Sequence, residues 1–313
     1  MSLILNLSLI LILFAILGWS ADVAVKNIKL IALSLRMKLF ALGIILGIMT
    51  TLPELSVGIN ATLEDAGALS VGNIMGGIVV LIGLILGSSL IANKKVATND
   101  IVKSLIPTSF VILAPFILGI DGRFDAIDGI IMVLLYLILI FWLYRTNKSK
   151  EPISLIRITN RRKAAKEVLL SVGGVIIVML TANWIIDLTM LLLDKVDVSK
   201  LLIGLILFSI GTNLPEITIA ITAWRHKTPD LSLFHLVSSS FTLILVLGLL
   251  SILKPITFTI GPVYYALAFF VSLMIILLII FSHTDKSLSR IEGAILLGVY
   301  FFFLATNIYL AVQ

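Results

Sequence analysis

The chain has 313 residues, of which 60% are hydrophobic and only 13% are charged, with a net charge of +6. Soluble domains are about 45–50% apolar and about 25% charged, so this composition excludes a soluble globular enzyme and a disordered chain. With Cys 0 and His 3, the sequence also excludes disulfides, a thiolate nucleophile and the usual zinc sites.

The predicted elements are membrane-spanning helices, because apolar runs of the roughly 20 residues needed to cross a bilayer recur along the chain. The first run is predicted to be a retained span rather than a secretion signal, since no Lys or Arg precedes Lys26. The sequence therefore predicts an all-α integral membrane protein. We expect ten spans, separated by short polar links and one longer basic link at 145–166: 2–21, 38–62, 70–92, 104–120, 126–144, 167–186, 200–224, 231–252, 258–282 and 291–311.

The basic residues support this count. When the links are numbered alternately, one side of the membrane receives all of the Lys and Arg except Arg123, Lys195, Lys200 and Lys254. By the positive-inside rule, the 145–166 link is cytoplasmic and both termini are extracytoplasmic. The net positive charge is thus read as a topology signal, and no nucleic-acid partner is expected.

The sequence contains one internal repeat. TTLPE at 50–54 recurs as TNLPE at 212–216, and at the same offset Ser70 corresponds to Ser232. Because the two copies lie in the second and the seventh predicted span, five spans apart, the halves have opposite orientations in the membrane, as in many secondary transporters. We therefore expect two inverted-topology five-helix repeats, 1–144 and 167–313, joined by the 145–166 link.

The repeated motif predicts a cation site. Glu54 and Glu216 lie inside apolar runs, where a charged side chain costs about 2.5–3.5 kcal/mol on insertion scales. Each follows a proline, Pro53 or Pro215, that leaves a backbone carbonyl without its helical partner. Thr50 and Thr212 precede their glutamates by four residues, so each hydroxyl is predicted to share a helix face with its carboxylate. Such a set of oxygens suits hard cations, above all Ca²⁺. The alternative is a helix kink beside a buried, hydrogen-bonded acid.

The predicted span 231–252 contains two further polar features. The run Ser238, Ser239, Ser240 and Thr242 is expected to pack closely against a neighbouring helix, and its hydroxyls are also candidate cation ligands. His235, near the start of its span, is predicted to be a hydrogen-bonded histidine at the membrane interface rather than a ligand.

These residues resemble the sodium/calcium exchanger family of the calcium/cation antiporter superfamily, and the chain is most similar to its compact prokaryotic members. The resemblance rests on 50–54 and 212–216, which look like the family's Gly-Thr-Ser-Leu-Pro-Glu motif. Supporting matches are the segments 19–22, 70–76 and 121–129. It covers essentially the whole chain. It implies that the first span of each half slides past the other helices, alternating access.

The resemblance also implies a set of ion ligands. Glu54 and Glu216 would bind Ca²⁺ with help from Thr50 and Thr212. Thr51, Asn213 and Ser239 would help to bind Na⁺.

Several positions depart from the family pattern. Met49 replaces a Gly, and Thr51 and Asn213 replace Ser. Gly77 lacks an expected Na⁺-binding hydroxyl, and Leu81 and Leu243 replace polar residues. A changed coupling ion, or fewer Na⁺ per cycle, is therefore expected.

The leading functional prediction is a Ca²⁺ antiporter of the plasma or inner membrane, driven by Na⁺. It has no cofactor, and no Gly-rich nucleotide loop indicates an ATP-driven pump or another enzyme. One alternative exchanges Ca²⁺, or another divalent cation, for H⁺. Another is a non-transporting membrane scaffold with a degenerate exchanger core. Partners other than the ions and the lipid bilayer, the oligomeric state and the role of the 145–166 link are left open.

Overall fold

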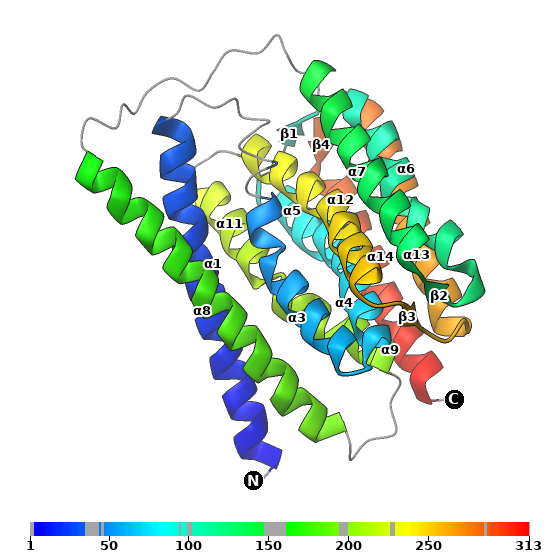
Figure 1. The fold of residues 1–313 in the computed structure, drawn as a ribbon. Helices are drawn as coiled ribbons and strands as arrows, with labels where there is room; N and C mark the ends of the chain where they lie inside the picture. Colours follow the sequence, from blue (N-terminus) through cyan, green and yellow to red (C-terminus); the bar gives the residue numbers. More distant parts are fainter. Residues whose placement is uncertain are drawn as a thin grey trace.

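The computed structural model describes residues 3–34, 44, 47–93, 95–98, 102–146, 161–193, 200–225, 229–284 and 287–312. Helices make up nearly all of this part of the chain (Figure 1). Two of the helical segments, η1 and η3, are π-helical, and η2 is a short 3-10 turn. The bounds are α1 (Leu3–Ser34), α3 (Leu52–Leu63), α4 (Gly67–Val79), η1 (Val80–Leu86), α5 (Gly87–Asn93), α6 (Val102–Leu118), η2 (Gly119–Asp121), α7 (Ala126–Thr146), α8 (Arg161–Leu193), α9 (Lys200–Ile203), η3 (Gly204–Phe208), α10 (Ser209–Thr212), α11 (Leu214–Arg225), α12 (Pro229–Leu253), α13 (Pro262–His283) and α14 (Arg290–Val312).

Two antiparallel strand pairs join segments that lie far apart in the sequence. β1 (Lys95–Ala97) pairs with β4 (Ser287–Ser289), so that Val96 lies opposite Leu288. β2 (Arg123–Phe124) pairs with β3 (Ile256–Thr257). The two pairs lie toward opposite ends of the helical bundle, and α1 begins at the same end as that at which α14 finishes (Figure 1).

Most of the predicted spans are present as helices that are long and apolar enough to cross a membrane. Six qualify singly, and a seventh is added if the bent pair formed by 200–212 and 214–221 counts as one span. They correspond to the predicted runs 70–92, 104–120, 126–144, 200–224, 231–252, 258–282 and 291–311. The protein is therefore an all-α, multi-pass membrane protein.

The other three predicted runs are less complete in the structure. The first lies in α1, whose apolar part is Ser8–Ser20, and 167–186 lies within α8. Most of 38–51 lies outside the described residues.

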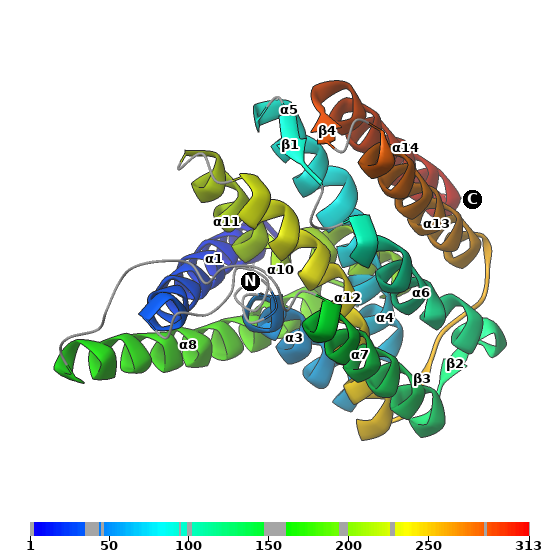
Figure 2. The same ribbon diagram turned by 90° about the horizontal axis from the view of Figure 1, so that it is seen from above.

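The helices form a central core with a crossed pair at one side. The segments 67–93 and 232–253 are the most enclosed, with 83% and 78% of their apolar windows buried, against 28–39% for the other four single helices. Helices that are apolar all round are expected at such a central position. α1 and α8 pack along each other at the edge of the bundle (Figure 2); α1 also contacts α11, and α8 contacts α3. Leu13, Phe14 and Leu17 of α1 belong to the buried cluster that joins this pair to the rest.

Candidate functional site

Both copies of the repeated motif lie where a helix is interrupted. Residues 47–50 are helical, Thr51 leaves the helix with φ −84° and ψ 5°, and α3 restarts with Pro53 in its first turn. In the second copy, Asn213 has φ −83° and ψ 13°, and the helices on either side are bent by 40°. Because proline has no N–H, it is tolerated in a first helical turn, and this is where both breaks position it. Glu54 and Glu216 therefore lie in the first turns of α3 and α11.

The two carboxylates come together in the interior. Both glutamates are 0% exposed. Their charges are close enough to interact directly. Among the described residues, none of the four carboxylate oxygens has a hydrogen-bond partner. Two neighbouring acids whose oxygens make no hydrogen bond form a pair whose negative charge a bound cation or proton would neutralise.

The threonines serve the opposite half of the chain from the one the sequence suggested. The Thr212 hydroxyl lies near the Glu54 carboxylate, and the Thr50 hydroxyl lies near Glu216. The sequence predicted that each threonine would share a helix face with the glutamate of its own motif, and it did not predict this contact with the other motif.

Two hydrogen bonds tie these threonines to the central helices. Thr50 Oγ1 and Ser239 Oγ of α12 lie 3.3 Å apart, and Thr212 Oγ1 donates to Asn73 Oδ1 of α4 at 3.1 Å. The sequence-predicted residues Thr50, Ser239 and Thr212 are thus brought together around the carboxylates. Asn73 was not predicted as a site residue. Its only signal was its place in the segment 70–76, which resembles the family.

Thr51 and Asn213, which follow the two threonines, differ in the hydrogen bonding of their side-chain oxygens. Thr51 Oγ1 donates to the carbonyl of Ile48 at 3.1 Å. Asn213 Nδ2 donates to the carbonyl of Ser209 at 2.7 Å, and within the described chain its Oδ1 has no partner. Asn213 therefore offers a free acceptor oxygen, whereas Thr51 is bonded to its own helix.

Glycines allow α4 to approach the broken second helix closely. A Cβ on Gly204 would lie 2.1 Å from the carbonyl oxygen of Leu69, and one on Gly72 would lie 2.1 Å from that of Leu201. Both contacts are to backbone, which cannot move aside as a side chain can. This reciprocal contact keeps Asn73 within hydrogen-bond distance of Thr212.

His235 contradicts the expectation of an interfacial, hydrogen-bonded histidine. The residue is 0% exposed, and neither ring nitrogen has a hydrogen-bond partner among the described residues. The described chain also holds no group of three or more His, Asp or Glu side chains placed to share a metal ion. Ligands beyond Glu54 and Glu216 would therefore be neutral groups.

An all-helical membrane fold with a helix broken inside the bundle is the architecture of a secondary transporter. The model of the sodium/calcium exchanger protein family matches residues 5–145 and 166–309. The chain therefore belongs to the sodium/calcium exchanger family, whose members are cation antiporters that carry Na⁺ and Ca²⁺ as substrates.

Relatives match over most of their length. The membrane protein MJ0091 of Methanocaldococcus jannaschii is 27% identical over 76% of this chain and 78% of its own. The sodium/calcium exchanger MaX1 of Methanosarcina acetivorans is 22% identical over 93% of this chain and 95% of its own. A solved structure of the sodium-calcium exchanger NCX_Mj, soaked with Na⁺ and Sr²⁺, covers 97% of this chain and 99% of its own. Its TM-score is 0.74 and its identity 24%, so it supports the fold.

Proposed function

We propose that this protein is a secondary antiporter that exchanges Ca²⁺ for Na⁺ by alternating access, with Glu54 and Glu216 as the shared ion-binding carboxylates. One observation carries the proposal: two fully buried carboxylates, close enough to interact electrostatically, make no hydrogen bond within the described residues. At about 2.5–3.5 kcal/mol or more for each buried charge, such a pair is not stable without a compensating cation or proton.

The surrounding groups favour a hard cation. Thr50, Thr212 and Ser239 supply hydroxyl oxygens, and Asn213 supplies an amide oxygen without a partner. Together with four carboxylate oxygens they offer enough ligands for Ca²⁺, which takes six to eight. We infer that Na⁺ competes for the same oxygens, with Asn213 and Ser239 contributing and Thr51 less available because its hydroxyl is bonded to Ile48. Ions that compete for one site are exchanged rather than carried together.

We further propose that ten spans form two inverted repeats, 1–144 and 167–313, joined by the 145–166 link. The strand pairs support this, because each joins a strand of one half to a strand of the other and the two pairs lie at opposite ends of the bundle. The reciprocal contacts of α1 with α11 and of α8 with α3 support it as well. The distribution of Lys and Arg favours extracytoplasmic termini in a plasma or inner membrane.

The second candidate exchanges the divalent cation for H⁺. It is favoured by Gly77, Leu81 and Leu243, which place apolar atoms on one side of the site where further Na⁺ would need oxygens. Carboxylates without donors can be neutralised by protons as well as by Na⁺.

Two measurements test these proposals. In proteoliposomes, Ca²⁺ uptake is measured under an imposed Na⁺ gradient and, separately, under a pH gradient. We expect uptake driven by Na⁺, and uptake driven by the pH gradient alone would select H⁺ as the coupling ion. Uptake in neither case, with no Ca²⁺-dependent rise in thermal stability, would favour a non-transporting scaffold.

Charge-removing variants test the site itself. Glu54→Gln and Glu216→Gln should each abolish Ca²⁺-dependent stabilisation, which for the unmodified protein reaches about 2.7 kcal/mol at 100 times Kd. Glu64→Gln, which changes an exposed carboxylate at the far end of α3, is the matched control and should retain it. Retention of stabilisation in both core variants would contradict the site assignment.

A further inference from the structure

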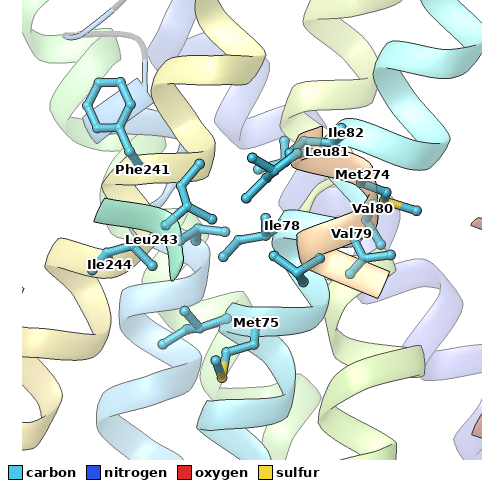
Figure 3. Packing of buried hydrophobic residues seen from close by; sticks show 14 of the residues in the cluster. Met75, Ile78, Val79, Val80, Leu81, Ile82, Phe241, Leu243, Ile244 and Met274 are labelled. Carbon is cyan, nitrogen blue, oxygen red and sulfur yellow. The ribbon is translucent and has the colours of Figure 1, made fainter. Parts of the chain in front are cut away.

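Beyond Asn73 of α4 and Ser239 of α12, the next turn of α4, η1 and α12 forms an apolar wall. Leu243 of α12 faces Ile78 of α4 and Leu81 of η1 (Figure 3), and all three are 0% exposed. Leu243 lies one turn beyond Ser239, the residue that contacts Thr50, and Leu81 lies one turn beyond Gly77. The oxygen-rich surroundings of the carboxylates therefore end abruptly at this layer.

The space beside Gly77 is occupied by Leu243 of this apolar layer and by Asn213 of the candidate site. A Cβ on Gly77 would lie 3.1 Å from Leu243 Cδ1 and 3.2 Å from Asn213 Nδ2. These distances are tighter than ordinary van der Waals contact, so Leu243 and Asn213 already fill the space beside Gly77. A further cation on this side would meet methyl groups and an amide N–H₂ instead of oxygen ligands.

The charge available to bound ions is set by two carboxylates. Among side chains whose burial the structure describes, the fully enclosed acids are Glu54 and Glu216, while Glu167 is buried on α8, the helix that pairs with α1. His235 adds no oxygen, and a charge on its unpartnered ring would be as costly as an unpaired carboxylate. Within the described part of the chain, the site therefore has two negative charges and no third.

An interior of low dielectric favours ion-loaded states that are close to neutral, because each uncompensated charge costs several kcal/mol. One divalent cation neutralises Glu54 and Glu216, and so do two monovalent cations or two protons. A third monovalent cation would leave one net positive charge against the apolar wall of Leu81 and Leu243.

We propose that this protein exchanges one divalent cation for two monovalent cations, so that transport moves no net charge across the membrane, and that Leu243 helps to set this stoichiometry by excluding a third ion. The inference rests on the proposed function. It does not depend on whether the monovalent ion is Na⁺ or H⁺.

The test measures the equilibrium distribution of Ca²⁺ in proteoliposomes containing the full-length protein. A fixed Na⁺ or H⁺ gradient drives exchange, and a K⁺ gradient with valinomycin sets the membrane potential to 0 or −100 mV. We expect the same Ca²⁺ ratio at both potentials. An exchange that moves one net charge would shift the ratio about 50-fold, since one charge crossing 100 mV corresponds to about 2.3 kcal/mol.

The outcomes separate the two proposals. A shift near 50-fold, with Ca²⁺ uptake intact, overturns the inference and leaves the proposed function standing. Absence of Ca²⁺ uptake under both gradients overturns the proposed function and the inference with it.

A pair of variants tests the role of Leu243. Leu243→Asp adds a third carboxylate to the wall, and Leu243→Asn is its neutral control of the same size, so a folding defect caused by polarity would affect both. We expect the Ca²⁺ ratio of the Asp variant to become dependent on potential, approaching 50-fold per 100 mV, and that of the Asn variant to stay constant. A transporting Asp variant without this dependence would overturn the assignment to Leu243.

Discussion

The candidate site depends on residues that cross between the halves of the chain. Thr212 lies beside Glu54 and bonds to Asn73, so one hydroxyl links the two halves of the chain at the candidate site. In the proposed function, this threonine orients an oxygen toward the bound ion. Loss of the hydroxyl alone should therefore weaken ion binding without removing a charge.

Thr212→Val tests this role. We expect Ca²⁺ binding to weaken by about 5- to 150-fold, because a lost buried hydrogen bond costs about 1–3 kcal/mol. The measurement is the Ca²⁺ dependence of the thermal unfolding temperature. Thr212→Ser keeps the hydroxyl and should bind Ca²⁺ nearly as well as the unmodified protein. Equal loss in both variants would point to the methyl group and contradict the proposed role.

The burial of the His235 ring leads to a prediction about stability. Its two buried ring nitrogens have no partner among the residues that the structure describes, and each group left unsatisfied carries a desolvation penalty of about 1–3 kcal/mol. His235→Leu removes both nitrogens at similar volume and should raise the unfolding temperature measured without ions. Asn73→Leu is the contrasting variant, because its Oδ1 accepts the Thr212 hydrogen bond, and it should lower that temperature. A lower unfolding temperature for His235→Leu would show that the ring has a stabilising partner.

The buried acid pair could be predicted from residue types alone, whereas the threonine contacts and the burial of His235 depend on tertiary structure. Two glutamates inside apolar runs predict a buried acid pair whatever the exact fold. The contact of each threonine with the glutamate of the other motif could not be predicted, because it depends on how the two halves of the chain pack together. The burial of His235 depends on how far α12 lies inside the bundle, which one sequence does not specify.

At the scale of elements, hydropathy predicted helices but not their interruptions. The run 200–224 was predicted as one span, whereas the structure divides it into α9, η3, α10 and α11. Pro215 indicated the break at Asn213. The π-helical segment η3 has no simple sequence signature, because it differs from an α-helix by one residue per turn in its hydrogen bonding. Such segments are frequent at functional sites, and η3 ends immediately before α10 and the motif.

Close helix contacts give a prediction for α7 and α12. A Cβ on Gly129 would lie 2.6 Å from the carbonyl oxygen of Gly248, so the two backbones touch. Gly129→Ala should destabilise the protein by about 1–3 kcal/mol, as overpacking usually does. The measurement is thermal or denaturant unfolding in detergent.

Gly298 provides the matched control for that variant. It also lies within a long helix, α14, but a Cβ there would meet nothing within 4 Å. Gly298→Ala should be neutral or stabilise by about 0.5–1 kcal/mol, because alanine favours the helix. If both variants behave alike, the close approach of α7 to α12 does not limit stability.

At the scale of the whole molecule, an ion pair joins the turn before α4 to the end of α12. Lys254 Nζ lies 2.7 Å from Asp65 Oδ1, with both side chains at the surface. The hydrogen bond and the charge of Lys254 hold the pKa of Asp65 below its usual value. An acid whose folded pKa is lowered stabilises fully above its unfolded pKa, about 3.9 for Asp, and loses this effect as the pH falls through the lowered value.

Asp65→Asn should therefore lower the unfolding temperature slightly at pH 7, and the difference from the unmodified protein should vanish once the pH falls below the lowered pKa of Asp65. The effect is small because water screens an exposed pair, and added salt should reduce it further. Lys254→Gln removes the other partner and should show the same pH dependence. A difference that persisted at low pH would indicate that Asp65 acts through its backbone conformation, whose φ is 57°.

Composition and periodicity were sufficient for the membrane class and for most spans, since long apolar runs have few alternatives. The packing of α1 against α8 and the two strand pairs were not predictable. They depend on contacts between residues far apart in the sequence, such as Val96 with Leu288.

The pairing of β1 with β4 has a consequence for how the protein is made. Roughly 190 residues separate the two strands, and ribosomes add about 5–20 residues per second, so β1 waits roughly 10 to 40 s for its partner. During that time its backbone edge is open to other chains emerging into the same membrane. In a half-length translation product, β1 would stay unpaired. We expect quality-control proteases to degrade such a product as an incompletely folded protein.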